Sequence, residues 1–236
     1  MRLPIYGMNH PITRLQFWFK DRGLTVLVLL LCFGMFVLEP LSDLGYITRG
    51  TSGLVTTMVV IVGLLAMPRT PLLNVTLMLL GGILIGVEWW RYTEPSARSI
   101  ATHGAMSILF LLLLGGSIML HVFAHGPVNA HRIQGAVAAY VIIAVIFAHA
   151  YAMIDAIVPD AFSINAAPAG ESTIGSRALY FSLVTLTSLG YGDITPVHPV
   201  AQSLATFEAL VGVLYPVLLI GRLVTLELRH TYKMRE

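Results

Sequence analysis

Long apolar runs, separated by short stretches of polar and charged residues, dominate the hydropathy pattern of the chain. Most of these runs approach or exceed the roughly 20 residues that a helix needs to cross the hydrocarbon core of a bilayer. They predict membrane-spanning helices at about 23–41, 53–68, 71–90, 104–124, 135–157 and 200–226. We therefore expect an all-α, multi-pass membrane protein whose six spans contact membrane lipid.

A shorter apolar segment lies between the last two runs, at residues 175–187 (GSRALYFSLVTLT). It is too short to cross the bilayer, and a helix that stops at membrane depth is tolerated only where protein or water surrounds its ends. We interpret it as a re-entrant helix, which enters the membrane without spanning it.

Lysine and arginine residues gather on one side of the predicted spans. With the N-terminus inside, ten of the 14 fall on the cytoplasmic side and four outside. This bias predicts that both termini are cytoplasmic, in a cell's inner or plasma membrane, and that the re-entrant helix enters from the outer face. Eight acidic residues then fall on the outer side, where they either attract cations or serve as solvated loop charges: Glu39, Asp43, Glu88, Glu94, Asp155, Asp160, Glu171 and Asp193.

The same pattern divides the chain into segments of different character. These are a cytoplasmic or interfacial N-terminal segment (1–22), a four-helix transmembrane domain (23–124), a cytoplasmic linker (125–134), two spans around the re-entrant helix (135–226) and a short cytoplasmic tail (227–236). A net charge of +2 is too small to indicate a nucleic-acid partner. No nucleophile–base pair, phosphate-binding glycine loop or metal-ligand signature stands out, so we expect neither an enzyme nor a cofactor.

The polar segment TLTSLGYGDITP, at 185–196, stands between two apolar runs. A dehydrated cation needs a replacement shell of oxygens, and backbone carbonyls can supply it if successive ones point to one axis. An ordinary strand alternates its carbonyls, so such a row needs residues with positive φ, which glycine adopts at little steric cost. Gly190 and Gly192 stand where this conformation is needed.

The residues around these glycines have expected supporting roles. The ring of Tyr191 should turn away from the axis and pack against the re-entrant helix, where Tyr180 and Phe181 are available as partners. The C-terminal end of that helix, near Thr187, carries the negative end of the helix dipole and would favour a cation.

The stretch TLTSLGYGD resembles the selectivity filter of potassium channels, whose core reads Thr-Val-Gly-Tyr-Gly followed by Asp. Thr185 and Thr187 precede the glycines and Asp193 follows them, between two spans, as in the pore domain of that family. The resemblance covers about 135–226 and implies a pore helix at 175–187, a filter at 188–193 and an inner helix at 200–226. It also implies a homotetramer that conducts K⁺, bound by the filter residues Ser188, Leu189, Gly190, Tyr191 and Gly192.

Three departures from the family pattern affect the expected selectivity and stability of the filter. Ser188 replaces threonine, so its hydroxyl is less constrained in rotamer, and Leu189 replaces valine. Some relatives brace the filter aspartate with an indole or a carboxyl from the pore helix. Phe181 and Val184 occupy those places and supply neither bond, so Asp193 must be braced differently. A weakly selective cation channel therefore remains an alternative to a potassium-selective one.

Candidate control elements lie in the last predicted span. Glu208 is a lone ionisable group at membrane depth, which is costly. Either it packs behind the filter and hydrogen-bonds hydroxyls such as those of Ser182 or Thr185, or it lines an aqueous cavity and attracts cations. Gly212 and Pro216 weaken one turn of the helix, as a gating hinge or as a static bend for packing.

Six spans with the pore in the last two resemble the voltage-gated cation channel superfamily. Gating by voltage needs several moving charges, each worth about 2.3 kcal/mol per 100 mV. The fourth predicted span, 104–124, contains no lysine or arginine, so we expect no steep voltage dependence.

Histidines are candidates for pH sensing, with His198 beyond the filter and His125 and His131 near the linker. His121 and His125 are four residues apart, as either interfacial histidines or part of a metal site. A rival function is a haem-carrying electron-transfer protein, with His121 and His149 as axial ligands.

Overall fold

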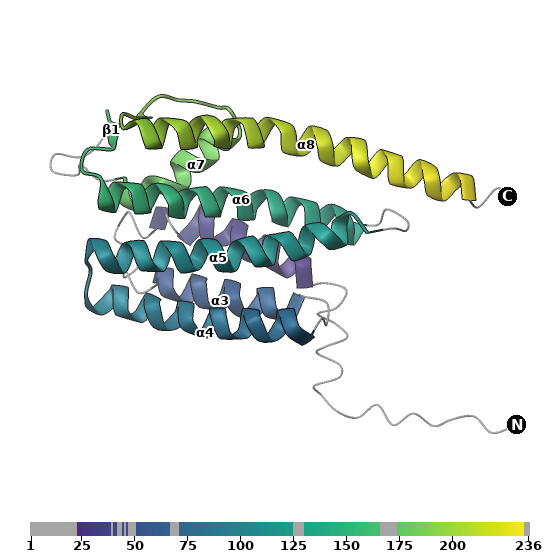
Figure 1. Cartoon of the computed structure of the whole chain (residues 1–236), viewed down its shortest axis with the longest axis horizontal. Coiled ribbons are helices and arrows are strands. Elements are labelled where there is room, and N and C mark those ends of the chain that lie inside the picture. The colour runs from purple at the N-terminus through teal and green to yellow at the C-terminus, as the bar shows by residue number, and fades with distance from the viewer. Residues whose placement is uncertain are drawn as a thin grey trace, which may run out of the picture.

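The computed structural model describes residues 23–38, 40–41, 44, 46, 51–66, 71–124, 130–165 and 174–233. These residues form a bundle of long helices with a two-stranded sheet at one end (Figure 1). The predicted N-terminal segment 1–22, together with His125 in the linker, lies outside the described residues.

Among the described residues, four helices are long and apolar enough to cross a membrane. They are α4 (Pro71–Thr93), α5 (Ala97–Val122), α6 (Ala130–Ile157) and α8 (Pro199–Lys233). The first two predicted spans appear as shorter helices, Gly23–Leu38 and α3 (Thr51–Ala66), and the first of them ends in the π-helical turn η1 (Gly34–Leu38). The described part of the chain is thus that of an all-α membrane protein, with four of the six predicted spans at spanning length.

Helices α5, α6 and α8 extend furthest beyond their predicted bounds. α5 begins at Ala97 rather than 104, because Ser96 and Ser99 form a reciprocal capping box that satisfies free N–H groups in the first turn. α6 begins at Ala130, inside the predicted linker 125–134, and α8 continues past 226 to Lys233. Apolar composition marks the part of a helix that suits lipid, whereas capping decides where the helix itself begins.

The predicted short helix is present, as a 3₁₀ turn η2 (Gly175–Arg177) followed by α7 (Ala178–Leu186). Two strands flank it in sequence, β1 (Phe162–Ile164) and β2 (Ile194–Pro196), and they pair antiparallel with Ser163 opposite Thr195. This pair was not predicted, because each strand is only three residues long.

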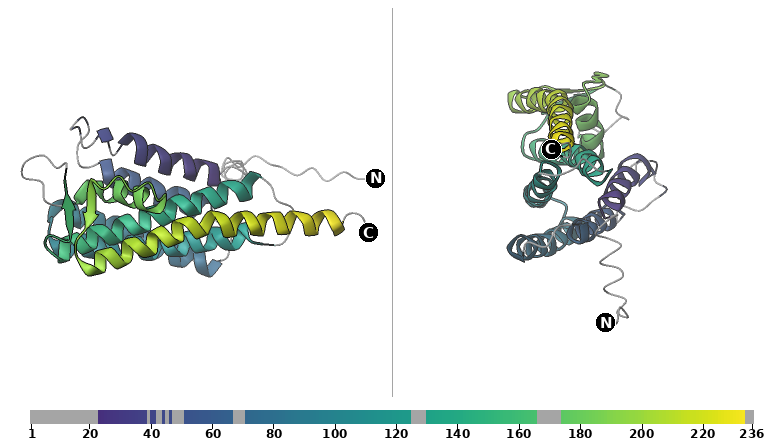
Figure 2. Two further views of the ribbon diagram at one scale, coloured as in Figure 1. Left: turned by 90° about the horizontal axis from the view of Figure 1, so that it is seen from above. Right: turned by 90° about the vertical axis from the view of Figure 1, so that its right-hand side faces the viewer.

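The helices enclose two apolar cores that share α6. The first core joins the helix Gly23–Leu38, α3, α4 and α5 to the first half of α6, where Ala139 and Ile142 are buried. The second joins the second half of α6 to α7, the strands and α8, with Tyr151 fully buried in it. Figure 1 shows α6 between α5 on one side and α7 and α8 on the other, and Figure 2 shows α8 extending beyond the other helices toward the C-terminus.

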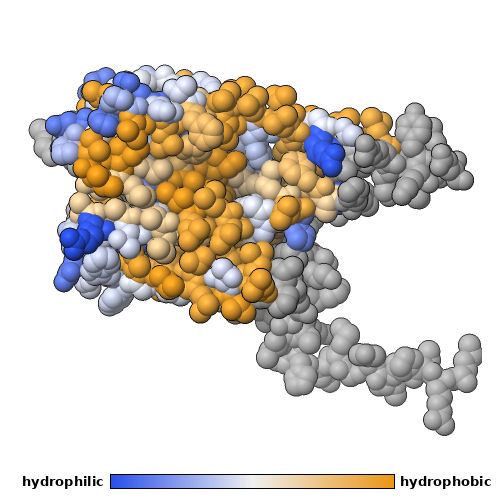
Figure 3. All heavy atoms as spheres, in the orientation of Figure 1, coloured by the Kyte–Doolittle hydropathy of each residue, from blue (hydrophilic) through white to orange (hydrophobic). Residues whose placement is uncertain are grey.

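The surface of the molecule has the distribution expected of a membrane protein. In Figure 3, hydrophobic residues cover the middle of the visible face, whereas hydrophilic residues gather at the end that carries the strands and the α4–α5 connection. Most of the large exposed side chains on α8 are apolar, including Phe207, Val213 and Val217.

Glu88 is not the outer loop charge that the sequence predicted. It lies within α4 with 8% of its surface exposed, and its carboxylate accepts two hydrogen bonds from Arg91. Its other close partner is His103 of α5, whose Nε2 lies 2.7 Å from Glu88 Oε2. The ring of His103 in turn meets that of His149 of α6 edge to face, with centroids 5.4 Å apart. A buried polar cluster therefore connects α4, α5 and α6.

We expect Glu88→Gln and His103→Gln to lower thermal stability in detergent non-additively, because the two side chains contact each other within a buried site. A double-mutant cycle should give a coupling free energy of about 0.5–3 kcal/mol. The control cycle pairs His103→Gln with Glu94→Gln, since Glu94 is exposed and hydrogen-bonds Trp90 instead. Equal coupling in the two cycles would contradict this assignment.

Candidate functional site

The segment after α7 folds back over the C-terminal end of that helix. The amides of Leu189 and Gly190 both donate to the carbonyl of Val184, at 2.9 and 3.3 Å, and the amide of Ser188 donates to that of Thr185. The Thr187 hydroxyl donates to the carbonyl of Leu183 one turn earlier. Carbonyls that would be unpaired at the end of α7 thus accept hydrogen bonds. These hydrogen bonds fix the position at which the glycine segment begins.

The glycine segment alternates the sign of φ. Ser188, Gly190 and Gly192 have φ of 58°, 59° and 79°, whereas Leu189 and Tyr191 are not among the residues with positive φ. Positive φ was predicted at both glycines but not at Ser188. A strand with one uniform conformation points its carbonyls alternately to opposite sides, and alternation of φ is what a row on one side requires.

Space does not explain the two glycines of this segment. A Cβ built on Gly190 or Gly192 meets no atom of the chain within 4 Å. The conformation itself is therefore what favours glycine, since an L-residue with positive φ is strained. The side chains beside these glycines are largely uncovered, with Leu189 55% and Tyr191 67% exposed.

The expected packing of Tyr191 on Phe181 is not among the ring contacts that the structure describes. Phe181 is buried, with its ring 4.8 Å from that of Tyr151 and 5.6 Å from that of Phe162. These rings lie together because aromatic side chains of α6 and β1 both pack on the buried face of α7. Of the two predicted partners, Tyr180 lies close enough to Tyr191 to interact with it electrostatically.

Tyr180 also supplies a contact to the aspartate that follows the glycines. Desolvation raises the pKa of the Tyr180 phenol above its ordinary value, and a hydrogen bond to Asp193 and the negative charge of that carboxylate raise it further. The sequence predicted that Asp193 is braced by something other than Phe181 or Val184. Tyr180, immediately before Phe181 on α7, provides such a contact.

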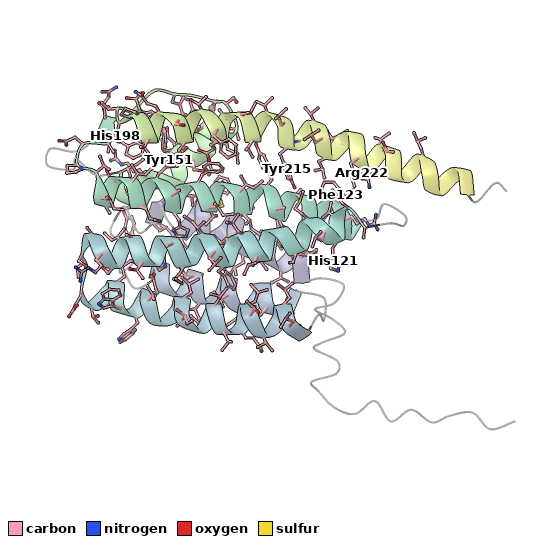
Figure 4. All side chains as sticks on the ribbon, in the orientation of Figure 1. His121, Phe123, Tyr151, His198, Tyr215 and Arg222 are labelled. Carbon is pink, nitrogen blue, oxygen red and sulfur yellow. The ribbon has the colours of Figure 1, made fainter. Side chains whose placement is uncertain are left out.

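Glu208 of α8 is completely buried and faces α6 and α7. The hydroxyls of Tyr151 and Ser182 each donate to one of its carboxylate oxygens at 2.5 Å, and Ser182 is also 2.8 Å from the carbonyl of Ala144. The contact with Ser182 was predicted, whereas no contact with Thr185 is found among the described hydrogen bonds. One carboxylate thus connects α6, α7 and α8, and Figure 4 shows Tyr151 between α6 and α8.

α8 approaches the end of α7 closely at Gly212. A Cβ built on it would lie 1.8 Å from the carbonyl oxygen of Leu186, the last residue of α7. α8 continues as one helix through Pro216, and its second half slopes away from its first half in Figure 1. The packing role of Gly212 is therefore supported directly, while a hinge at Gly212 and Pro216 stays a prediction.

Comparisons with known proteins agree with this geometry. Residues 137–228, from early α6 to near the end of α8, match a family model described as "Ion channel". These residues form an ion channel domain. The predicted resemblance is thereby confirmed for this part of the chain, which contains the glycine segment, Glu208 and Gly212.

Two curated relatives share part of this chain. Protein LctB of Bacillus caldotenax is 40% identical over 62 residues, which is 26% of this chain and 46% of the relative. Protein LctB of Geobacillus stearothermophilus is 40% identical over 63 residues, 24% of this chain and 46% of the relative. The matches thus span less than half the length of these relatives, and no solved structure matches the chain.

The predicted histidines are dispersed over the molecule. His198 lies at the end of the ion channel domain that carries the strands, and its Nδ1 accepts a hydrogen bond from the Val200 amide (Figure 4). His131 lies in the first turn of α6. No group of three or more His, Cys, Asp or Glu residues that could hold a metal ion occurs within the described ranges. A role in pH sensing stays a prediction for each of them.

The two histidines of the haem hypothesis lie far apart, His121 on α5 and His149 on α6. His121 occupies the last turn of α5, with Nδ1 3.0 Å from the Ser117 carbonyl oxygen, whereas His149 packs against His103 near the start of α5. His103 and His121 are 18 residues apart on one helix, or about 27 Å at 1.5 Å per residue. Because His149 packs against His103, His121 and His149 lie too far apart to be the two axial ligands of one haem in this chain.

Sequence reasoning missed three anchoring residues of the ion channel domain. Besides Tyr151, the hydroxyl of Tyr215 on α8 donates to the carbonyl of Ala136 on α6 at 2.7 Å. The carboxylate of Asp155, predicted as an outer charge, accepts a hydrogen bond from the amide of Ile174 just before η2. A tyrosine within an apolar span is the signal that was available, because its buried hydroxyl needs a partner.

Replacement of Glu208 should destabilise the domain. We expect Glu208→Ala to lower the free energy of unfolding by about 2–4 kcal/mol, because it creates a cavity and leaves the Tyr151 hydroxyl unpaired. Glu208→Gln, which keeps one acceptor oxygen, should lose less. Thermal unfolding in detergent, followed by circular dichroism, measures both. Thr206→Ala, exposed on the same helix, is the control, and equal stability of Glu208→Ala and this control would refute the assignment.

A methyl group at Gly212 should displace the end of α7. We expect Gly212→Ala to abolish ion flux or to prevent folding, since the new Cβ would overlap a backbone carbonyl that cannot rotate away. Gly221→Ala lies on the same helix with no atom within 4 Å of its Cβ, so it should keep flux and gain up to about 1 kcal/mol of helix propensity. Flux assays on reconstituted vesicles and thermal unfolding compare the two, and normal flux in Gly212→Ala would contradict the close approach.

Proposed function

We propose that this chain forms a potassium-selective channel, in which K⁺ passes passively through a homotetrameric pore. The observation that carries the proposal is the alternation of φ over Ser188, Gly190 and Gly192, directly after the C-terminal end of a short helix. In this proposal α7 is the re-entrant pore helix, and residues 188–193 are the filter. The carbonyls of Ser188, Leu189, Gly190 and Tyr191, with the Ser188 hydroxyl, replace the water around K⁺.

The need for four copies follows from the ion. One chain provides a single row of oxygens, whereas a dehydrated cation needs oxygens on all sides. The exposure of Leu189 and Tyr191 supports this stoichiometry, since both apolar side chains would gain cover from an adjacent copy. A groove on the first part of α8, lined by Pro199, Val200, Ser203, Leu204 and Phe207, offers a further surface for subunit contact.

The remaining parts of the proposal concern orientation and gating. Both termini lie in the cytoplasm, and the end that carries the strands and His198 faces outward. α5, which corresponds to the fourth predicted span, carries Arg98 near its start as its one lysine or arginine, so the channel opens without steep voltage dependence. The first four helices then serve as a support for α6 rather than as a voltage sensor.

Selectivity is tested by reversal potentials. Purified protein in planar bilayers, with K⁺ on one side and Na⁺ on the other, should give a reversal potential close to that of a K⁺ electrode. Gly190→Ala should reduce the current, because an L-residue at φ 59° costs about 1–2 kcal/mol of backbone strain, whereas Gly86→Ala in α4 should not. A reversal potential near zero with robust current would identify the weakly selective cation channel instead. Absence of current under all gradients would refute the channel function.

A further inference from the structure

The segment that follows the filter is held by the chain that follows α6. β1 pairs with β2 in a register that sets Ile164 opposite Ile194. The pairing continues one residue further, since the amide of Asn165 donates to the carbonyl of Asp193 at 2.9 Å. At the other end of the pair, the amides of Val197 and His198 both donate to the carbonyl of Ala161. The outer end of the filter is thus attached to a strand about 30 residues earlier in the chain.

The side chain of Asn165 contacts the filter directly. Its Nδ2 lies 3.4 Å from the carbonyl oxygen of Gly192, as a donor to that oxygen. Gly192 is the last of the three residues with positive φ. The amide therefore reaches the outermost carbonyl of the alternating row, while the backbone of the same residue fixes the next carbonyl.

We propose that Asn165 is a positioning residue for the outer end of the filter, and this rests on the proposed function. The positions from which relatives brace the filter aspartate carry Phe181 and Val184, which have no hydrogen-bonding side chain. The brace comes instead from two other directions. Tyr180 of α7 contacts Asp193 from the helix side, and Asn165 contacts Gly192 and Asp193 from the strand side.

The hydrogen bond from Asn165 also weakens the ability of the Gly192 carbonyl oxygen to coordinate a cation. A carbonyl oxygen that accepts an N–H is partly neutralised and fixed in direction, so it coordinates a cation less strongly. A cation at the outer end competes with the amide for this oxygen. Removal of the amide therefore strengthens cation binding at the outermost position and leaves the deeper positions, at Ser188 to Tyr191, unchanged.

External Ba²⁺ is a suitable probe, because it resembles K⁺ in size and carries twice the charge. We expect Asn165→Leu, which keeps the approximate volume and removes the donor, to lower the half-blocking concentration of external Ba²⁺ by about three- to tenfold, the range for one hydrogen bond. The K⁺/Na⁺ reversal potential should stay within experimental error of the unmodified channel. Asn165→Ala should shift the block in the same direction, as a second variant with a smaller side chain.

Ser163→Leu is the matched control. Ser163 is exposed on β1, two residues from Asn165, so the substitution adds similar apolar surface without removing a contact to the filter. Two results would show that Asn165 is not a positioning residue. One is a half-blocking Ba²⁺ concentration for both Asn165 variants within twofold of that for Ser163→Leu. The other is a loss of K⁺/Na⁺ selectivity together with thermal stability in these variants. An unmodified channel that carries no K⁺ current would refute the proposed function instead, and the two failures are therefore distinguishable.

Discussion

A carboxyl group in the interior of a membrane protein needs hydrogen-bond donors, because neither lipid nor apolar side chains can replace the water around it. Glu208 meets this requirement with one hydroxyl from α6 and one from α7, and so it fixes the mutual position of the three helices of the ion channel domain. Any shift of α8 relative to α7 would leave a buried polar atom without a partner. The position of α7 in turn determines the position of the glycine segment that follows it.

Two further contacts position α8 within the ion channel domain. Gly212 lets α8 approach the last carbonyl of α7 closely, and Tyr215 ties the next turn of α8 to the start of α6. On the other side of the glycine segment, the strand pair and Tyr180 hold the residues after Gly192. The segment is therefore restrained from both ends and from behind, while its own side chains at Leu189 and Tyr191 remain uncovered in the single chain.

Features that depend on local sequence could be predicted, and features that depend on distant residues could not. Positive φ at Gly190 and Gly192 follows from the glycines themselves, and a partner for Glu208 on α7 follows from the cost of a lone carboxylate at that depth. By contrast, nothing near Glu88 in sequence indicates that His103 lies against it, and Asn165 is 27 residues before the carbonyl that it contacts. Short pairings such as β1 with β2 leave no periodic pattern, and helix ends depend on caps rather than on hydropathy.

The order of the two apolar cores along the chain has a consequence for biosynthesis. The first core draws its buried residues from Leu24 to Ile142, and the second from Phe147 to Ala201, so the two hardly overlap in sequence. Because a growing chain leaves the ribosome from its N-terminus, the first core can close while α7 and α8 are still being made. The second half of α6 is then already in place as a surface on which the last third of the chain folds.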